Sequence, residues 1–266
     1  MPDIDAGLLE RGGLRLTVDG QRATITLNRP DVLNAQTPSM WEALQQIGER
    51  LDPDVRVVVV RGSGRAFSAG LDTRMFSPDG IEGEAGFAKI SNSSAAEGEA
   101  IIDGFQRGFT WLADPGRVTI AAVHGHAIGA GFQLALACDL RVAAVDARFT
   151  MAEPSLGLVP DLTGTLPLVR AVGYARAADI CLTGRRVPAD EALSIGLVNS
   201  VVPADGLDQA VDELVAAVSK PAVGAVRETL ALLANAATAP TLDEQRKLEA
   251  QAQLRRFADL KALLGG

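Results

Sequence analysis

The sequence predicts an α/β protein with a helical C-terminal part. Two apolar, β-branched runs, at residues 55–62 and 118–125, each break into a loop of small residues, a pattern typical of buried parallel strands. Strand, loop, helix and strand follow one another between residues 118 and 153, which favours right-handed parallel crossovers. From residue 165 onward helical patterns dominate. We therefore expect a sheet-containing core over residues 1–202 and a helical subdomain over residues 203–266.

Composition excludes several classes of protein. The chain has 266 residues, of which 47% are hydrophobic and 22% charged, as in ordinary soluble globular proteins. A net charge of -8 argues against nucleic-acid binding. No apolar run approaches the roughly 18 residues of a membrane span, and the acidic N-terminus is unlike a signal peptide. We expect a cytoplasmic protein that binds neither nucleic acid nor membrane.

The two cysteines are informative about compartment and metals. Cys138 and Cys181 each lie in an apolar helical stretch. This pattern predicts two small buried thiols in a reducing compartment, with no disulfide framework and no metal site.

The N-terminal elements have clear local signals. Asp19-Gly20, between two alternating runs, predicts a hairpin. Thr37 and Pro38 predict an N-cap and first turn for a helix that ends near residue 51. Residues 75–98 lack periodicity, so we interpret them either as a lid over a site or as a plain surface loop.

The later elements follow from periodicity. Apolar spacing predicts helices over residues 100–113 and 133–138, and strands over residues 140–146 and 149–153. Further helices follow residue 165, then a short strand over residues 197–202. The last three helices are expected to start near residues 206, 221 and 241.

The loops after the two buried strands suggest a carbonyl-binding site. Both consist of small residues that leave backbone N–H groups unobstructed, and the second leads directly into a helix start, where N–H groups are unpaired. One donor from each loop would form an oxyanion hole. The alternative is that small residues only let helices approach the sheet.

Other familiar sites are absent from the sequence. Neither glycine loop fits G-x-G-x-x-G, no Walker lysine is present, and there is no G-x-S-x-G elbow. His124 and His126 are interpreted as packing or hydrogen-bonding groups at a strand end.

Two carboxylates near this region are candidates for acid–base chemistry. Glu153 lies at a predicted strand end among apolar residues, where a charge is either well partnered or functional. Asp161 follows Pro160 in a turn and is either a helix N-cap or a second acid.

Four segments together resemble the enoyl-CoA hydratase/isomerase, or crotonase, superfamily. They are GRAFSAGLD, HGHAIGAGFQLALACDLRVAA, the pattern F-x-x-x-E-x-x-x-G-x-x-P from Phe149, and ALSIGLVNSVVP from Ala192. The resemblance implies a spiral of repeated ββα units and a helical C-terminal subdomain that forms a homotrimer or a dimer of trimers. It implies an acyl-CoA substrate and no separate cofactor, since coenzyme A enters as part of the substrate.

The resemblance also implies roles for individual residues. The oxyanion donors would be the backbone N–H groups of Leu71 and Ala130, and the catalytic carboxylates Glu153 and Asp161. The remaining residues implied to contact the substrate or its CoA part are Val32, Leu33, Ala69, Gly70, Asp72, Gly129 and Gln133.

The residue at position 133 indicates which reaction to expect. Hydratases that the chain resembles use two glutamates, and Gln133 stands in place of the first. A glutamine exchanges no proton at neutral pH, whereas one carboxylate suffices to move a double bond. Dienoyl-CoA isomerases carry an aspartate at the position of Asp161, but also a carboxylate at that of Gln133. We expect double-bond isomerisation by Glu153; the alternatives are hydration and non-catalytic acyl-CoA binding.

Overall fold

The computed structural model describes residues 4–77, 80–84 and 86–264, and its centre is a six-stranded sheet. The sheet order is β1-β2-β3-β4-β6-β9; β1 runs antiparallel to β2, and all later pairs are parallel. The strands of this sheet are β1 (Leu14–Asp19), β2 (Arg22–Leu27), β3 (Val57–Gly62), β4 (Val118–Val123), β6 (Leu140–Ala144) and β9 (Ser200–Val202). A second sheet consists of β5 (His126–Ile128), β7 (Arg148–Thr150) and β8 (Val187–Pro188).

Both faces of the sheet are buried at β3 and β4, which is why these two strands have nearly continuous apolar sequences. Alternate side chains of β3, such as Val58 and Val60, join the large core beneath the first helices. The intervening Val57 and Val59 join a second core, closed by Leu207 and by other residues of α9.

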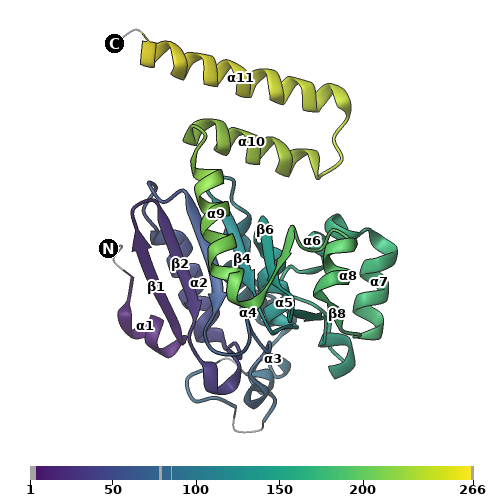
Figure 1. Ribbon diagram of the computed structural model, residues 1–266. Coiled ribbons are helices and arrows are strands. Elements are labelled where there is room, and N and C mark those ends of the chain that lie inside the picture. The colour runs from purple at the N-terminus through teal and green to yellow at the C-terminus, as the bar shows by residue number, and fades with distance from the viewer. Residues whose placement is uncertain (1–3, 78–79, 85, 265–266) are drawn as a thin grey trace.

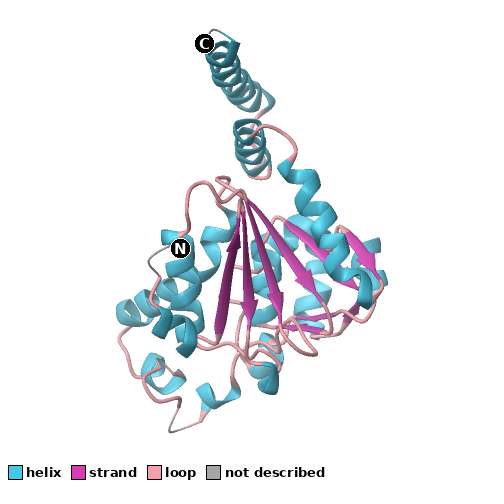
Figure 2. Ribbon diagram, turned by 60° about the vertical axis from the view of Figure 1, so that its left-hand side comes forward, coloured by secondary structure: helices cyan, strands magenta, loops and turns pink. Residues whose placement is uncertain are grey.

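The helices cover the sheet on both sides (Figures 1 and 2). Those before β4 are α1 (Ala6–Arg11), α2 (Pro38–Arg50), α3 (Phe87–Ser91) and α4 (Ala95–Thr110). Those that follow are α5 (Ala130–Ala137), α6 (Thr165–Val172), α7 (Tyr174–Thr183), α8 (Ala189–Ser194), α9 (Leu207–Ser219), α10 (Val223–Ala236) and α11 (Leu242–Leu264). The α/β fold with a helical C-terminal part is thus confirmed.

Local sequence signals gave the correct N-terminal elements. The hairpin turns at Gly20, whose φ is +54°, and the Thr37 hydroxyl caps α2 by accepting from the Met40 N–H. The starts expected for α9, α10 and α11 agree with the structure to within two residues.

The expectation of an irregular segment over residues 75–98 is wrong in part. It contains α3 and the first turn of α4, which begins five residues before the predicted start at residue 100. Ser94 and Glu97 form a reciprocal capping box there, a signal that the sequence carried. Residues 78, 79 and 85, which belong to the same segment, lie outside the described residues.

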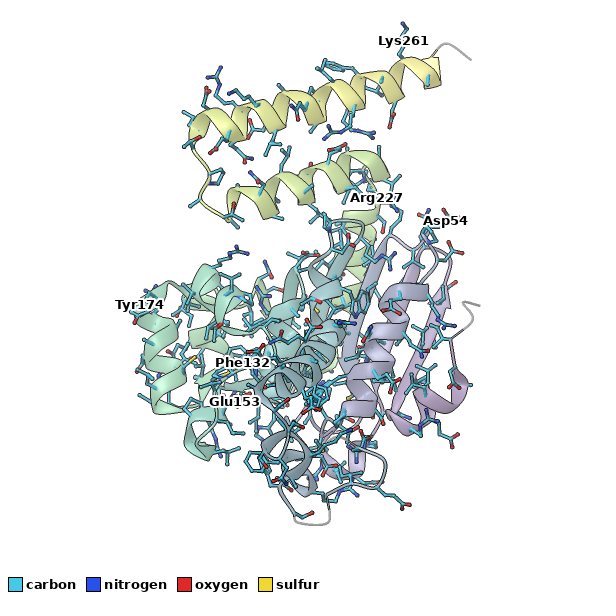
Figure 3. All side chains as sticks on the ribbon, turned by 180° about the vertical axis from the view of Figure 1, so that it is seen from behind. Asp54, Phe132, Glu153, Tyr174, Arg227 and Lys261 are labelled. Carbon is cyan, nitrogen blue, oxygen red and sulfur yellow. The ribbon has the colours of Figure 1, made fainter. Side chains whose placement is uncertain are left out.

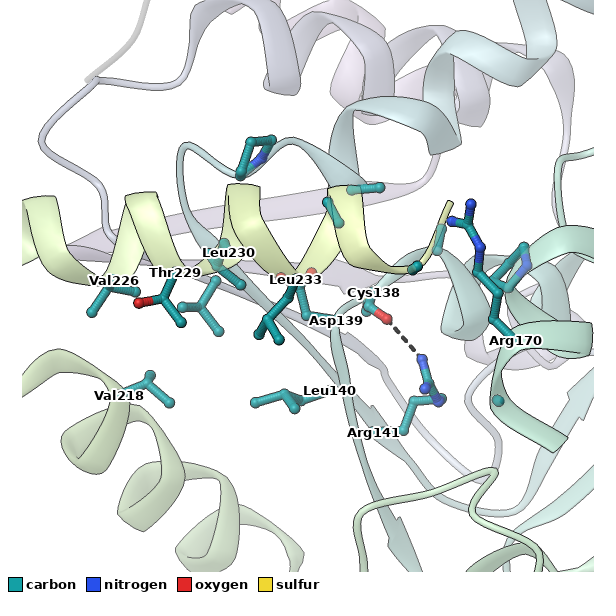
Figure 4. Close-up of a pocket in the computed structure, with 18 of the residues that line it drawn as sticks. Cys138, Asp139, Leu140, Arg141, Arg170, Val218, Val226, Thr229, Leu230 and Leu233 are labelled. Carbon is teal, nitrogen blue, oxygen red and sulfur yellow. Dashed lines mark hydrogen bonds between the residues drawn. The ribbon is translucent and has the colours of Figure 1, made fainter. Parts of the chain in front are cut away.

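α10 and α11 lie together beyond one end of the sheet (Figure 1). Beneath α10 runs an apolar groove of about 820 Å³, bordered by β6, α6 and α9. Figure 4 shows Leu230 and Leu233 of α10 facing Leu140 across it, and the Arg141 guanidinium bound to the Cys138 carbonyl at 2.7 Å. Cys138 is buried as expected, but Cys181 is only half-buried, because α7 lies at the surface.

Candidate active site

Two loops that are distant in sequence lie side by side, and their hydrogen bonds fix the direction of one N–H group. The Gln36 N–H donates to the Gly70 carbonyl at 2.7 Å, and the Asp72 N–H donates to the Gln36 carbonyl at 2.8 Å. Successive peptide groups of an extended segment point to opposite sides. The N–H of Leu71, which lies between these two contacts, therefore points away from Gln36.

The end of β5 lies on that opposite side. The Ile128 N–H donates to the Ser68 carbonyl at 3.0 Å. A Cβ on Gly70, whose φ is +89°, would lie 2.5 Å from the Ile128 oxygen and 3.6 Å from the Ala130 nitrogen. Ala130 is the first residue of α5, so its N–H has no partner within the helix. The backbone thus brings Gly70, the residue before Leu71, next to the nitrogen of Ala130.

Glu153 supplies a buried carboxylate next to this backbone. It opens a short 3-10 helix, Glu153–Leu156, directly after β7, and is 9% exposed. A Cβ on Gly129, whose φ is +49°, would lie 3.0 Å from Glu153 Oε1. Figure 3 marks Glu153 in the body of the molecule, far from Lys261 on α11.

The two oxygens of Glu153 differ in their contacts. Gln133 Nε2 donates to Oε1 at 2.7 Å. Oε2 is buried and has no hydrogen-bond partner among the described residues. One oxygen is therefore held in place, and the other is available to a bound molecule.

Gln133 has its orientation fixed by the backbone on its far side. Its Oε1 accepts the Leu162 N–H at 2.9 Å and the Gly164 N–H at 3.1 Å. Because backbone N–H groups only donate, the amide oxygen must face them and Nε2 must face Glu153. Gln133 is thus a neutral clamp on the carboxylate, and not a group that exchanges a proton.

Asp161 is the nearest second acid. Burial raises the pKa of the Glu153 carboxyl, and the negative charge of Asp161 raises it further, against the opposing hydrogen bond from Gln133. Burial also raises the pKa of the half-buried Asp161. The helix N-cap interpretation of Asp161 is wrong, because α6 begins four residues later, at Thr165, with Gly164 as its cap.

The other predicted contact residues line the same loops. Val32 is 45% exposed at the end of a 3-10 turn, Pro30–Val32. Leu33 has a φ of +51°, and its carbonyl accepts the Ala69 N–H at 2.8 Å. Ala69 and Leu33 are half-buried, so this end of the site is partly exposed to solvent.

Asp72 differs from the other predicted contact residues because two arginine side chains bind its carboxylate. Its carboxylate is bound by Arg29 at 2.9 Å and by Arg74 at 2.8 Å, and these contacts hold its pKa well below the usual range. The geometry makes Asp72 an anchor of its loop.

Two other polar groups show what the sequence alone did and did not reveal. His124 Nε2 lies 3.0 Å from the Gly64 carbonyl oxygen, which agrees with the expected hydrogen-bonding role at a strand end. The buried Asn34, with a φ of +56°, was missed: its amide donates to the carbonyls of Ser63 and Ala66 at 2.8 Å each. Asparagine tolerates positive φ, so its place in a loop was a usable signal.

Comparison with known families shows to which family this chain belongs. A family model described as "Enoyl-CoA hydratase/isomerase" matches residues 19–262. The chain belongs to the enoyl-CoA hydratase/isomerase family. The resemblance to the crotonase superfamily is thereby confirmed, and the protein is an acyl-CoA enzyme of the hydratase/isomerase type.

Relatives in this family are named for hydration and dehydration. The chain is 38% identical over 195 residues to a probable enoyl-CoA hydratase of Mycobacterium bovis, covering 71% of this chain and 68% of the relative. It is 41% identical over 202 residues to a carnitinyl-CoA dehydratase of Salmonella arizonae, covering 74% and 71%.

Solved structures of the family share the whole architecture. A structure described as an enoyl-CoA hydratase from Thermobifida fusca YX in complex with CoA has a TM-score of 0.92 and 46% sequence identity, over 97% of each chain. The same protein in complex with acetoacetyl-CoA also gives 0.92 and 46%, over 96% of this chain and 99% of the other.

The described part of the chain has neither a helix suited to a membrane nor a cluster of metal ligands. No helix there is both long and apolar enough to cross a bilayer. No three His, Cys, Asp or Glu side chains of the described residues gather as a metal-ion site.

Proposed function

We propose that the protein moves a double bond in an enoyl-CoA thioester, with Glu153 as the sole proton carrier. The observation that carries this proposal is the asymmetry of Glu153. Its Oε1 is held by the Gln133 amide, its Oε2 is buried and unpartnered within the described structure, and Gln133 has no proton to exchange. One carboxylate with one working oxygen suits transfer of a single proton between two carbons.

The steps follow from the positions of these groups. The thioester carbonyl oxygen accepts hydrogen bonds from the N–H groups of Leu71 and Ala130. Glu153 Oε2 removes a proton from C2 of a 3-enoyl thioester, and the electrons move to the carbonyl oxygen to form an enolate. The C3–C4 double bond shifts to C2–C3 as the same carboxylic acid returns the proton to C4. Glu153 is then ionised again, and coenzyme A, part of the substrate, is the only carrier group this scheme uses.

The electrostatics of the site support each step. Backbone donors preorganised in a buried pocket stabilise an oxyanion far more than water does, with a lost donor typically costing about 10²–10³-fold in rate. A carboxyl whose pKa is raised toward neutrality takes and returns a proton more evenly than an ordinary glutamate. Burial, reinforced by Asp161, raises the pKa of Glu153 in this direction.

Hydration is the second candidate, and it rests on Asp161. Its carboxyl lies close enough to Glu153 to raise that residue's pKa, and burial raises its own. Two such acids can divide the work of adding water to a 2-enoyl thioester, one taking a proton from water and the other supplying one to C2. The relatives named as hydratase and dehydratase favour this candidate.

Parallel assays of 3-enoyl-CoA isomerisation and 2-enoyl-CoA hydration distinguish the two candidate reactions. We expect the wild type to isomerise 3-enoyl-CoA much faster than it hydrates 2-enoyl-CoA, and Asp161→Asn to retain isomerisation. Faster hydration in the wild type, abolished by Asp161→Asn, would replace the first proposal by the second. Acyl-CoA binding without turnover of either substrate would contradict both.

We also infer that the protein assembles through its C-terminal helices. α10 and α11 expose large apolar side chains, among them Leu233, Leu254 and Phe257 at 62%, 66% and 57%. Leu233 also borders the open groove under α10. Large apolar side chains exposed on two neighbouring helices favour an interaction site. Light scattering coupled to gel filtration should give a trimer or hexamer; a monomer at micromolar concentration would contradict this.

A further inference from the structure

Ser68 lies where the two donor loops join. It is fully buried in the loop after β3, and its backbone pairs with β5 on one side: its N–H donates to the His126 carbonyl at 2.8 Å, and its carbonyl accepts the Ile128 N–H at 3.0 Å. Three residues further along its own chain is Leu71, and two residues beyond Ile128 is Ala130. Ser68 is therefore a residue at which the two loops are hydrogen-bonded to each other, shortly before the N–H groups of Leu71 and Ala130.

The Ser68 hydroxyl links this backbone pairing to the segment that contains Asn34 and Gln36. It donates to the Asn34 carbonyl at 2.8 Å. It accepts the Gly70 N–H at 3.2 Å and Gln36 Nε2 at 3.1 Å. A hydroxyl has one donor and two acceptor sites, so every site of this one is in use.

The first turn of α5 rests directly on the same side chain. A Cβ on Gly131 would lie 2.7 Å from Ser68 Cβ and 2.9 Å from Ser68 Oγ. The start of α5, which carries the Ala130 N–H, is therefore set by the position of Ser68.

We propose that Ser68 is a positioning residue, which sets the distance and direction between the N–H groups of Leu71 and Ala130. This inference rests on the proposed function, in which those two groups hold the thioester carbonyl. The hydroxyl acts by fixing the Ala69–Gly70 peptide, whose N–H it accepts, and this peptide adjoins at the Gly70 Cα the next one, which carries the Leu71 N–H. It touches no substrate in this account.

Loss of the hydroxyl has a defined local consequence. Ser68→Ala leaves the Gly70 N–H and the Gln36 amide without their acceptor in a buried place, and such groups move to find new partners. The Ala69–Gly70 peptide then turns, and the adjoining peptide that carries the Leu71 N–H shifts with it through the shared Gly70 Cα. A misplacement of about 1 Å in a catalytic constellation can cost about 10²-fold in rate.

Acetoacetyl-CoA provides a readout that is independent of turnover. Its C2 proton is acidic, and its enolate absorbs in the near ultraviolet where the keto form does not. Donors that stabilise an oxyanion raise the enolate fraction of the bound thioester at fixed pH. We would measure this fraction, the dissociation constant of acetoacetyl-CoA, and kcat and KM for the enoyl-CoA substrate.

The variants are Ser68→Ala, Ser68→Cys and a matched control, Thr119→Val. A thiol is a weaker hydrogen-bonding group than a hydroxyl, so the cysteine variant should lie between wild type and alanine. Thr119 is also fully buried, and its hydroxyl donates to the Leu112 carbonyl at 2.8 Å near the amino end of β4, away from both loops. Its loss should lower the melting temperature without changing the enolate fraction.

We expect Ser68→Ala to lower kcat and the bound enolate about 10- to 100-fold, with the dissociation constant changed by less than about threefold. Wild-type enolate fraction and kcat in a folded Ser68→Ala protein would overturn the positioning role alone. Should Ser68→Ala not fold, an Ser68→Cys enolate fraction equal to that of the wild type would overturn it equally. A wild type that binds the thioester but forms no bound enolate would instead overturn the proposed function.

Discussion

Replacing Gln133 by glutamate tests the clamp on the catalytic carboxylate most severely. In Gln133→Glu, one oxygen of the introduced carboxylate still accepts the Leu162 and Gly164 N–H groups, so the fold of that turn is kept. The other oxygen takes the place of Nε2, which donates to Glu153 Oε1 at 2.7 Å. A hydrogen-bond donor is thereby exchanged for a second negative charge at the same place.

The magnitude follows from that distance. Two unit charges 2.7 Å apart repel by about 6 kcal/mol at an effective dielectric constant of about 20. That is more than the roughly 4 kcal/mol needed to protonate an ordinary glutamate at pH 7, so the pair keeps one shared proton. Because the Leu162 and Gly164 N–H groups stabilise the introduced carboxylate in its charged form, this proton resides mainly on Glu153. The base must be ionised to act, and activity is lost as the pH falls through its pKa. A higher pKa therefore moves this loss to higher pH.

The assay is the pH dependence of kcat/KM for 3-enoyl-CoA isomerisation, which reports the ionisation of the free enzyme. We expect the acidic limb of Gln133→Glu to lie well above that of the wild type. Gln45→Glu is the control, because it makes the same chemical change on α2, away from Glu153. An acidic limb that is the same in Gln133→Glu and wild type would refute the clamp.

Three further predictions concern single side chains of the same region. Asp161→Asn removes the charge that raises the pKa of Glu153, so the acidic limb of the isomerisation profile should move to lower pH; an upward shift would contradict this. Gly129→Ala places a methyl group 3.0 Å from Glu153 Oε1 at a φ of +49°, and should lower both kcat and, by about 1–3 kcal/mol, the free energy of unfolding. Gly157→Ala, at a φ of +74° with open space around it, should lower stability only, as judged by urea unfolding and kcat. Asp72→Asn should lower the free energy of unfolding at pH 7 by about 1.5–3 kcal/mol. Its pKa is lowered in the folded protein, so this difference should shrink as the pH falls below about 4, and a constant difference would contradict the two-arginine anchor.

Elements with local signals were predictable from the sequence. The hairpin at Gly20 and the helix capped by Thr37 each depend on a few adjacent residues. The buried strands β3 and β4 were recognisable because both of their faces need apolar side chains. The strands β5 and β8 were missed, since they have three and two residues and depend on pairing with residues from elsewhere in the chain, among them those of β7.

The residues of the candidate site likewise include some that were predictable from the sequence and others that were not. Glu153 was recognisable as a charge among apolar neighbours, and the structure shows it buried with one unpartnered oxygen in the described part of the chain. The roles of Leu71 and Ala130 as donors remain a prediction, supported by the adjacency of their loops. The clamp by Gln133 could not be foreseen, because it depends on backbone N–H groups about 30 residues away. The link made by Ser68 likewise depends on partners in separate loops.

The central claim is that Glu153 carries the proton, and Glu153→Gln tests it most directly. Glutamine has the same shape but cannot exchange a proton at neutral pH, and loss of general acid–base help typically costs about 10²–10⁴-fold. We predict that kcat for 3-enoyl-CoA isomerisation falls by about that factor or more, while the dissociation constant of the acyl-CoA changes little. Isomerisation at the wild-type rate by this variant would contradict the mechanism.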